Sequence, residues 1–140
     1  SAAGLLTQIG SLAYSVTKNA AVALAEWIAI TYGDRGIGVS VLCPQAVESN
    51  IRANSPTAHL LDADQAFGAA GVDGVLTAEE LAEVVVEGLA DGRFHILPHA
   101  DVAEYVRRKG DDVDRWLSGM RRFQRRLYPE GPTPADWLAG

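Results

Sequence analysis

Apolar residues occupy nearly all sides of one long segment near the start of the sequence. From about Ser11 to Tyr32 there is no proline and no glycine, so nothing in the sequence interrupts a helix. The segment also carries small side chains that allow other elements to approach closely: Ala20, Ala21, Ala23, Ala25 and Ala29. A helix that is apolar all round must be covered all round. The pattern therefore predicts a long helix packed against a sheet on one side and against a helix or another subunit on the other.

A short buried strand is predicted directly after this helix. Gly33 to Gly36 end the helix, and Ile37 to Cys43 form a largely β-branched and apolar run that Pro44 closes. A helix followed within four residues by such a strand is the second half of a β-α-β unit, which is typical of a parallel sheet covered on both faces. We expect residues 1 to 12, before the helix, to form a loop, and Cys43 to be a small core residue.

The segment after the strand is the first candidate for ligand binding. Residues 44 to 55 form a loop at the carboxyl end of the predicted strand, where open α/β sheets place their ligands. Residues 54 to 74 then combine a proline, a stretch from Ala58 to Phe67 that favours a short helix, and three glycines. Two interpretations of residues 50 to 75 stay open, namely a substrate lid and an ordinary surface excursion.

The second half of the chain predicts a helix, a short strand and further helices. Thr77-Ala-Glu-Glu80 has the pattern of a capping box and opens a helix that ends at Asp91-Gly92. The apolar face of this helix consists of Leu81, Val84, Val85 and Leu89. Phe94 to Leu97 follows as a short strand, and residues 101 to 140 are expected to form the C-terminal helices and tail.

Within this C-terminal region we expect Asp101 to cap one helix. Apolar residues repeat at helical spacing after Gly110, which predicts an amphipathic helix to about Leu127, and Pro129 to Pro134 is expected to be irregular. Eight of the twelve basic residues fall here: Arg107, Arg108, Lys109, Arg115, Arg121, Arg122, Arg125 and Arg126. They form either the solvated face of a helix, which the interleaved apolar residues favour, or a surface for an anionic partner.

Together these elements predict an α/β fold that is incomplete. The chain supplies only two predicted strands, and such a pair cannot cover itself, because parallel sheets are buried on both faces. We therefore expect residues 1 to 140 to be the C-terminal portion of a single doubly wound parallel-sheet domain, with two strands plus flanking helices and the N-terminal half missing. The chain also begins with serine rather than methionine.

Composition and charge narrow the classes of function. A formal charge of −6 and a pI of about 4.9 argue against a dedicated nucleic-acid binder. The single cysteine forms no internal disulfide, so a reducing cytoplasm is the expected location. The longest apolar run is much shorter than the roughly 18 residues that span a bilayer, and no signal peptide is visible. Neither nucleic acid nor a membrane is therefore an expected partner.

The strongest chemical signal is Tyr14-Ser-Val-Thr-Lys18, at the start of the long helix. Residues four apart lie on the same face of a helix, so a phenol and an ammonium lie side by side. A nearby positive charge favours the phenolate form, which suits a tyrosine that passes a proton to or from an alcohol or a carbonyl. Taken alone, a pair at this spacing is more often an ordinary pair of neighbours on a helix surface.

Three short motifs lie at fixed spacing around this pair. Ser1 lies thirteen residues before Tyr14, Lys18 lies four residues after it, and Pro44-Gln-Ala-Val-Glu-Ser49 follows the next strand. These residues resemble the catalytic serine, the Tyr-x-x-x-Lys and the Pro-Gly-x-Val/Ile-x-Thr motifs of classical short-chain dehydrogenases/reductases. The resemblance runs from Ser1 to about Leu97 and corresponds to the C-terminal half of that family's Rossmann-type domain.

The resemblance implies an enzyme that transfers a hydride between NAD or NADP and a carbonyl or secondary-alcohol substrate. It implies that Tyr14 is the general acid/base and that Lys18 supports Tyr14, both residues also contacting the cofactor. Ser1 is then expected to hydrogen-bond the substrate oxygen and to stabilise the charge that develops there.

The resemblance also implies a nicotinamide site after the predicted strand. Pro44, Val47 through its backbone and Ser49 through its hydroxyl are expected to hold the carboxamide of the cofactor. Ile51 and Leu60, in the segment that follows, are expected to contact the substrate. The substrate itself is expected to be a partly hydrophobic carbonyl compound or alcohol.

The chain departs from the family pattern in three respects. Gln45 replaces a glycine, which puts a turn geometry in doubt, and Ser49 replaces a threonine but keeps the hydroxyl. The glycine-rich phosphate turn of the family is absent from these residues, so we expect activity to belong to the complete enzyme rather than to this fragment. Similar enzymes are dimers or tetramers, and the long helix, with Trp27 and Ile30, is expected to form part of such a homo-oligomeric interface.

Other classes of function fit the sequence less well. The main alternative is a non-enzymatic binding or oligomerisation fragment, but a pure interaction module has no reason to keep the serine, tyrosine and lysine at this spacing. A hydrolase is disfavoured because there is no G-x-S-x-G motif. No metal site is expected, because His59, His95 and His99 show no ligand pattern.

Overall fold

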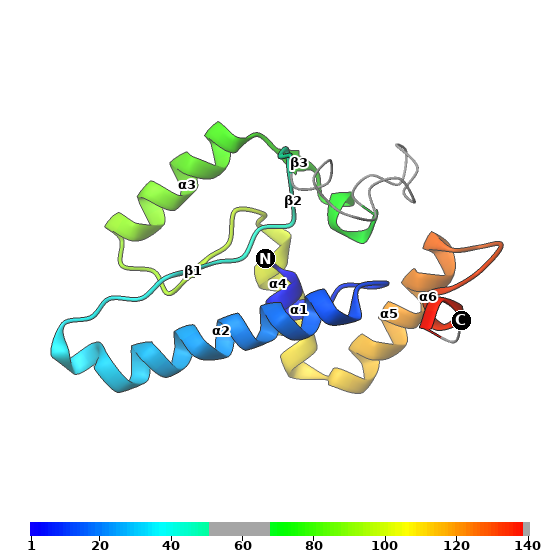
Figure 1. Ribbon diagram of the computed structural model, residues 1–140, viewed down its shortest axis with the longest axis horizontal. Helices are drawn as coiled ribbons and strands as arrows, with labels where there is room; N and C mark the ends of the chain where they lie inside the picture. Colours follow the sequence, from blue (N-terminus) through cyan, green and yellow to red (C-terminus); the bar gives the residue numbers. More distant parts are fainter. Residues whose placement is uncertain (51–67, 139–140) are drawn as a thin grey trace.

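The computed structural model describes residues 1–50 and 68–138 and consists of helices and very short parallel strands (Figure 1). In chain order the elements are α1 (Ala3–Leu6), α2 (Leu12–Tyr32), the 3-10 turn η1 (Gly33–Arg35), β1 (Val41–Leu42), β2 (Ala46–Val47), the 3-10 turn η4 (Gly68–Gly71), β3 (Val75–Leu76), α3 (Ala78–Ala90), β4 (His95–Ile96), α4 (Asp101–Asp111), α5 (Val113–Leu127) and α6 (Pro134–Leu138). In the view of Figure 1, β1 runs between α2 and α3.

The strands form two separate parallel pairs, β1 with β4 and β2 with β3. The N–H of Val41 donates to the carbonyl of Phe94 (2.7 Å), and the N–H of Cys43 donates to the carbonyl of Ile96 (2.9 Å). The pairing of β1 with β4 joins the two segments that the sequence predicts as strands. The predicted α/β class with parallel strands is therefore confirmed.

Two details of the strand prediction are wrong. The described residues contain four strands rather than two, because β2 and β3 are each two residues long and are too short to show a periodic pattern. The run from Ile37 to Cys43 is a strand only at Val41 and Leu42. A segment forms a strand where it is hydrogen-bonded to a neighbouring strand. Within this run, β4 pairs only with Val41 and Leu42.

Residues 1 to 12 are not the simple loop that the sequence predicts, because α1 packs closely on α2. A Cβ atom added at Gly4 would lie 2.7 Å from the backbone oxygen of Lys18 and 2.8 Å from Cγ2 of Val22. Only a residue without a side chain allows this approach, so tertiary packing overrides the low helix propensity of glycine. α1 also contacts α4, so a helix at the start of the chain packs against one from its second half.

The most deeply buried side chains lie around β1 and β4. Cys43 follows β1 and is fully buried, which confirms it as a small core residue, and Ile96 of β4 is also buried. Gly88 of α3 lies against Ile96, because an added Cβ would meet the Ile96 side chain at 2.8 Å. Val102, at the start of α4, is the other fully buried residue of this region.

α2 begins and ends where the sequence predicts, but the described residues cover only one side of it. Ser15 and Val22 are buried on the side that faces α1. Leu24, Trp27 and Ile30 are 58, 55 and 85% exposed, respectively. The prediction of a helix covered all round is therefore not met by the described part of the chain.

The capping box at the start of α3 is confirmed. The Thr77 hydroxyl accepts a hydrogen bond from the Glu80 N–H (3.2 Å), and the Glu80 carboxylate accepts one from the Thr77 N–H (2.8 Å). These bonds lower the pKa of Glu80, the backbone bond being the larger cause. α3 then ends at Ala90, just before the predicted Asp91-Gly92 stop, where Gly92 adopts a φ of 66°.

The C-terminal helices follow the predicted order, with two corrections. Asp101 is the first residue of α4 rather than its cap, and Ala100 occupies the cap position without a side-chain hydrogen bond. Asp112 instead caps α5, where its carboxylate accepts from the N–H of Arg115 (2.9 Å). α6, at Pro134–Leu138, was not predicted; the carboxylate of Asp136 accepts from the N–H of Thr133 (2.7 Å).

The two arginines of α4 are paired within their own helix. The carboxylate of Glu104 accepts from Arg107 (2.8 Å) and from Arg108 (2.6 Å), and these bonds lower the pKa of Glu104 to about 2. Both arginine side chains are about 60% exposed, so this pairing supports the solvated-face interpretation. Among the helices of residues 1–50 and 68–138, none is long and apolar enough to cross a membrane.

Candidate active site

The structure places Tyr14 and Lys18 side by side on the first turns of α2. The Lys18 ammonium nitrogen lies 5.2 Å from the centroid of the Tyr14 ring, within the range of a cation–π contact. Tyr14 is 38% exposed, and Lys18 is half-buried. The pair therefore keeps its phenol accessible from solvent while the ammonium is held close to the ring.

Polar bonds hold this end of α2 against the preceding residues. The Ser15 hydroxyl is buried and accepts from the Gln8 N–H (2.9 Å). The Asn19 amide donates to the carbonyl of Ala3 (3.1 Å) and to that of Ser15 (2.9 Å). Sequence reasoning missed these residues, because a serine and an asparagine in a helix show no sign of their partners. They fix the position of the turn that carries Tyr14.

Ser1 lies at the carboxyl end of β1, beside the same region of α2. Its amino group donates to the Leu42 carbonyl (2.9 Å) and its hydroxyl accepts from the Ala3 N–H (3.2 Å). Cys43, one residue beyond Leu42, is fully buried. Burial raises the pKa of the Cys43 thiol. Ser1 is therefore held between the end of β1 and the start of α1.

The loop after β1 is bonded to the same cluster. The Pro44 carbonyl accepts from the Ala2 N–H (2.8 Å), so the residue next to Ser1 is joined to the Pro44 loop. Just after β2, the Glu48 N–H donates to the Leu76 carbonyl of β3 (2.8 Å). Successive N–H groups of a strand point in opposite directions, so the Val47 N–H points away from β3. Ser49, two residues further on, is exposed.

A hydrogen-bonded network surrounds Gln45, the position at which the family that the sequence resembles has a glycine. The Gln45 side chain donates to Asp73 (2.5 Å), and the other carboxylate oxygen of Asp73 accepts from the Tyr105 hydroxyl (3.0 Å). The Gln45 N–H donates to Nδ1 of His99 (3.2 Å), a side chain only 6% exposed. The side-chain bond through Asp73 to Tyr105 joins the loop to α4 in a way that glycine would not. Burial and the bond to Asp73 raise the pKa of Tyr105.

Several predicted site features lie outside the described residues. Ile51 and Leu60, the expected substrate contacts, both fall in the segment 51–67 that the structure does not describe, as does the helix expected from Ala58 to Phe67. Most of the expected lid at 50–75 falls there too. Among the described residues, no group of three or more histidine, cysteine, aspartate or glutamate side chains is arranged to hold a metal ion.

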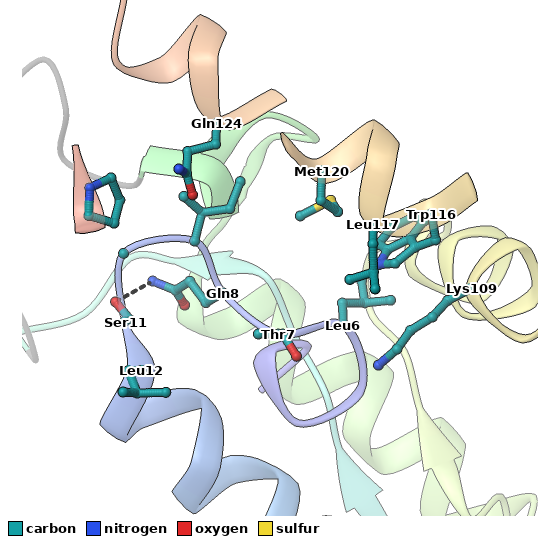
Figure 2. Close-up of a pocket in the computed structure, with 13 residues that line it drawn as sticks. Leu6, Thr7, Gln8, Ser11, Leu12, Lys109, Trp116, Leu117, Met120 and Gln124 are labelled. Carbon is teal, nitrogen blue, oxygen red and sulfur yellow. Dashed lines mark hydrogen bonds between the residues drawn. The ribbon is translucent and has the colours of Figure 1, made fainter. Parts of the chain in front are cut away.

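A cavity of about 380 Å³ lies between residues 6–12 and α5 (Figure 2). One wall is the turn that leads into α2, including Ser11 and Leu12, and the opposite wall includes Trp116 and Met120 of α5. Lys109 reaches the cavity from α4. Sequence reasoning did not find this cavity, because its two walls are about a hundred residues apart in the chain.

Comparison with known proteins finds similarity to dehydrogenases. The chain is 32% identical over 130 residues to the 1-deoxy-11-beta-hydroxypentalenate dehydrogenase of Streptomyces exfoliatus, which covers 93% of this chain and 41% of that protein. It is 35% identical over 132 residues to the protein of the same name from Streptomyces arenae, which covers 91% of this chain and 41% of that protein. The chain therefore spans about two fifths of the length of these relatives. No family model and no solved structure matches it.

Proposed function

We propose that the chain is the C-terminal part of a short-chain dehydrogenase/reductase that interconverts a secondary alcohol and a carbonyl compound with NAD or NADP. The observation that carries the proposal is the Tyr14–Lys18 pair, with 5.2 Å between the ammonium and the ring centroid, on a helix end that polar bonds hold in place. The similarity to two dehydrogenases supports the same class of reaction. The non-enzymatic alternative leaves this arrangement without a role.

In this proposal Tyr14 moves the proton of the reaction. When an alcohol is oxidised, the Tyr14 phenolate takes the hydroxyl proton; when a carbonyl is reduced, the Tyr14 hydroxyl returns it. The Lys18 ammonium stabilises the phenolate through charge attraction. Ser1 donates a hydrogen bond to the same substrate oxygen, for which its hydroxyl rotates while it continues to accept from Ala3.

In this proposal, groups of the described residues would hold the nicotinamide of the cofactor. The Val47 N–H points away from β3 and so remains available for a carboxamide, and the Ser49 hydroxyl is exposed beyond it. The Ala2 N–H bonds to the Pro44 carbonyl and the Asn19 amide bonds to the Ala3 carbonyl, so residues 2 and 3 link the Pro44 loop to the turn of α2 that follows Lys18. When bound, the nicotinamide supplies or accepts the hydride. The residues of this chain orient it and handle the proton.

The decisive experiment replaces Tyr14 by Phe in the complete enzyme, assayed first with 1-deoxy-11-beta-hydroxypentalenate, the compound in the relatives' names, and then with a panel of secondary alcohols. Removing only the hydroxyl should lower kcat by about 10²- to 10⁴-fold, the usual contribution of a general acid/base, and leave cofactor binding largely intact. Tyr32→Phe, at the other end of α2, is the matched control and should keep its activity. Full activity in Tyr14→Phe would refute the proposal.

A second proposal concerns assembly, because α2 exposes a large apolar surface. Leu24, Trp27 and Ile30 are all more than half exposed within the described residues, and such surfaces commonly mark an interface. We propose that the complete enzyme is a homodimer or homotetramer that uses this part of α2. Sedimentation of the intact protein at micromolar concentration should show an oligomer, and a monomer would contradict the proposal.

A further inference from the structure

The cavity in Figure 2 has the size and lining of a small-molecule site. Its volume of about 380 Å³ falls within the range of ligand pockets, roughly 300 to 1,000 Å³. Trp116, Leu117 and Met120 line it from α5, and Leu6, Ile9 and Leu12 line it from the residues before and at the start of α2. Apolar side chains on two facing walls suit the hydrophobic body of a ligand.

Lys109 is the only cationic side chain among the residues that line this cavity in the described part of the chain. It is half-buried, and its ammonium donates to the Leu5 carbonyl (2.6 Å), which holds the side chain toward the cavity. An ammonium has three donors, so two remain after this bond. A half-buried cation next to apolar walls favours an anionic ligand group, because charge pairing offsets the cost of removing the cation from water.

The cavity opens at the same end of α2 as the proposed catalytic pair. Ser11 lines the cavity and is the residue that immediately precedes α2, three positions before Tyr14 in the chain. Gln8, which also lines the cavity, bonds to Ser15, next to Tyr14 in the chain. One set of bonds therefore positions both a wall of the cavity and the catalytic turn.

We propose that this cavity binds the substrate of the enzyme and that the substrate is an apolar acid: an aliphatic ring system that carries a carboxylate. Lys109 binds the carboxylate, while Trp116 and Met120 contact the apolar rings. This inference rests on the proposed dehydrogenase function and adds a substrate class and a residue that recognises it.

The test uses two probes of nearly the same shape, adamantane-1-carboxylate and the neutral adamantane-1-carboxamide. Isothermal titration calorimetry measures the binding of each to the complete enzyme with its cofactor bound. The carboxylate should bind about tenfold more tightly than the carboxamide, which is the effect of one hydrogen bond to a charged group. Lys109→Met should abolish this preference, and Lys109→Arg, which keeps the positive charge, should restore most of it.

Arg115→Gln is the matched control, because Arg115 is an exposed cation of α5 that does not line the cavity. It should keep the tenfold preference. Trp116→Ala should weaken both probes by a similar factor. Equal binding of the two probes by the wild-type enzyme, no binding of either, or an unchanged preference in Lys109→Met overturns the proposal. Because no turnover is involved, these outcomes are separate from the Tyr14→Phe assay, which tests the dehydrogenase function itself.

Discussion

The two halves of α2 differ in what holds them. The first half, from Leu12 to Val22, is bonded to residues 3 and 8 through Ser15 and Asn19 and packs on Gly4. The second half exposes Leu24, Trp27 and Ile30 within the described residues. A proton-transfer pair needs fixed geometry, whereas an assembly surface needs exposed apolar area. The first half of α2 thus provides the fixed geometry, and the second half extends an exposed apolar surface to which Leu12 and Val16 of the first half also contribute.

Gly4→Ala is expected to have the largest effect on stability. The new Cβ would meet the Lys18 backbone oxygen at 2.7 Å, and backbone cannot move aside as a flexible side chain can. Overpacking of this kind typically costs about 1 to 3 kcal/mol of unfolding free energy, measured by denaturant titration of the complete protein. If the clash moves α1, the position of Lys18 should also shift and activity should fall.

Gly110→Ala is the control for this substitution. Nothing lies within 4 Å of a Cβ added at Gly110, which is inside α4, so the change should stabilise the protein by up to about 1 kcal/mol through helix propensity. Equal stability changes in the two alanine variants would mean that the first half of α2 is not held by close packing on α1.

Ser15→Ala is expected to have an intermediate effect. The Ser15 hydroxyl is buried and satisfies the Gln8 N–H at 2.9 Å, so its removal leaves a partly buried donor without its partner. The expected loss is about 1 to 2 kcal/mol of unfolding free energy. Thr17→Ala removes an exposed hydroxyl that donates only to the Tyr14 carbonyl of the same helix, and it should change stability by less than about 0.5 kcal/mol. Similar losses in both variants would contradict a special role for the Ser15 bond.

Local sequence patterns predicted the elements well and the contacts between them poorly. The extent of α2, the capping box of α3 and the amphipathic α5 all follow from residues within one segment. α1 was missed because Gly4 is helical only through its packing on α2. The pair of β2 and β3 was missed because each strand depends on a partner almost thirty residues away.

In the candidate site, too, the sequence predicted neighbours within one helix but not contacts between separate segments. The Tyr14–Lys18 pair follows from helical spacing, and the structure confirms that the two side chains are neighbours. The bond from Lys109 to the Leu5 carbonyl joins residues 104 positions apart, and the Gln45–Asp73–Tyr105 network joins three separate segments. No periodicity or motif encodes such contacts, since they depend on how the elements pack.

Ile30→Ser should have the smallest effect on the stability of the folded subunit. It tests whether the second half of α2 serves assembly while the first half does not. Ile30 is 85% exposed, so the subunit loses little buried apolar area, and the unfolding free energy extrapolated for the isolated subunit should change by less than about 0.5 kcal/mol. If this half of α2 is an interface, however, sedimentation should show dissociation at a higher protein concentration than for the wild type. Ala21→Ser, at an exposed position in the first half, is the matched control and should leave the dissociation concentration unchanged. Unchanged association in both variants would mean that the exposed apolar half of α2 has another role than assembly.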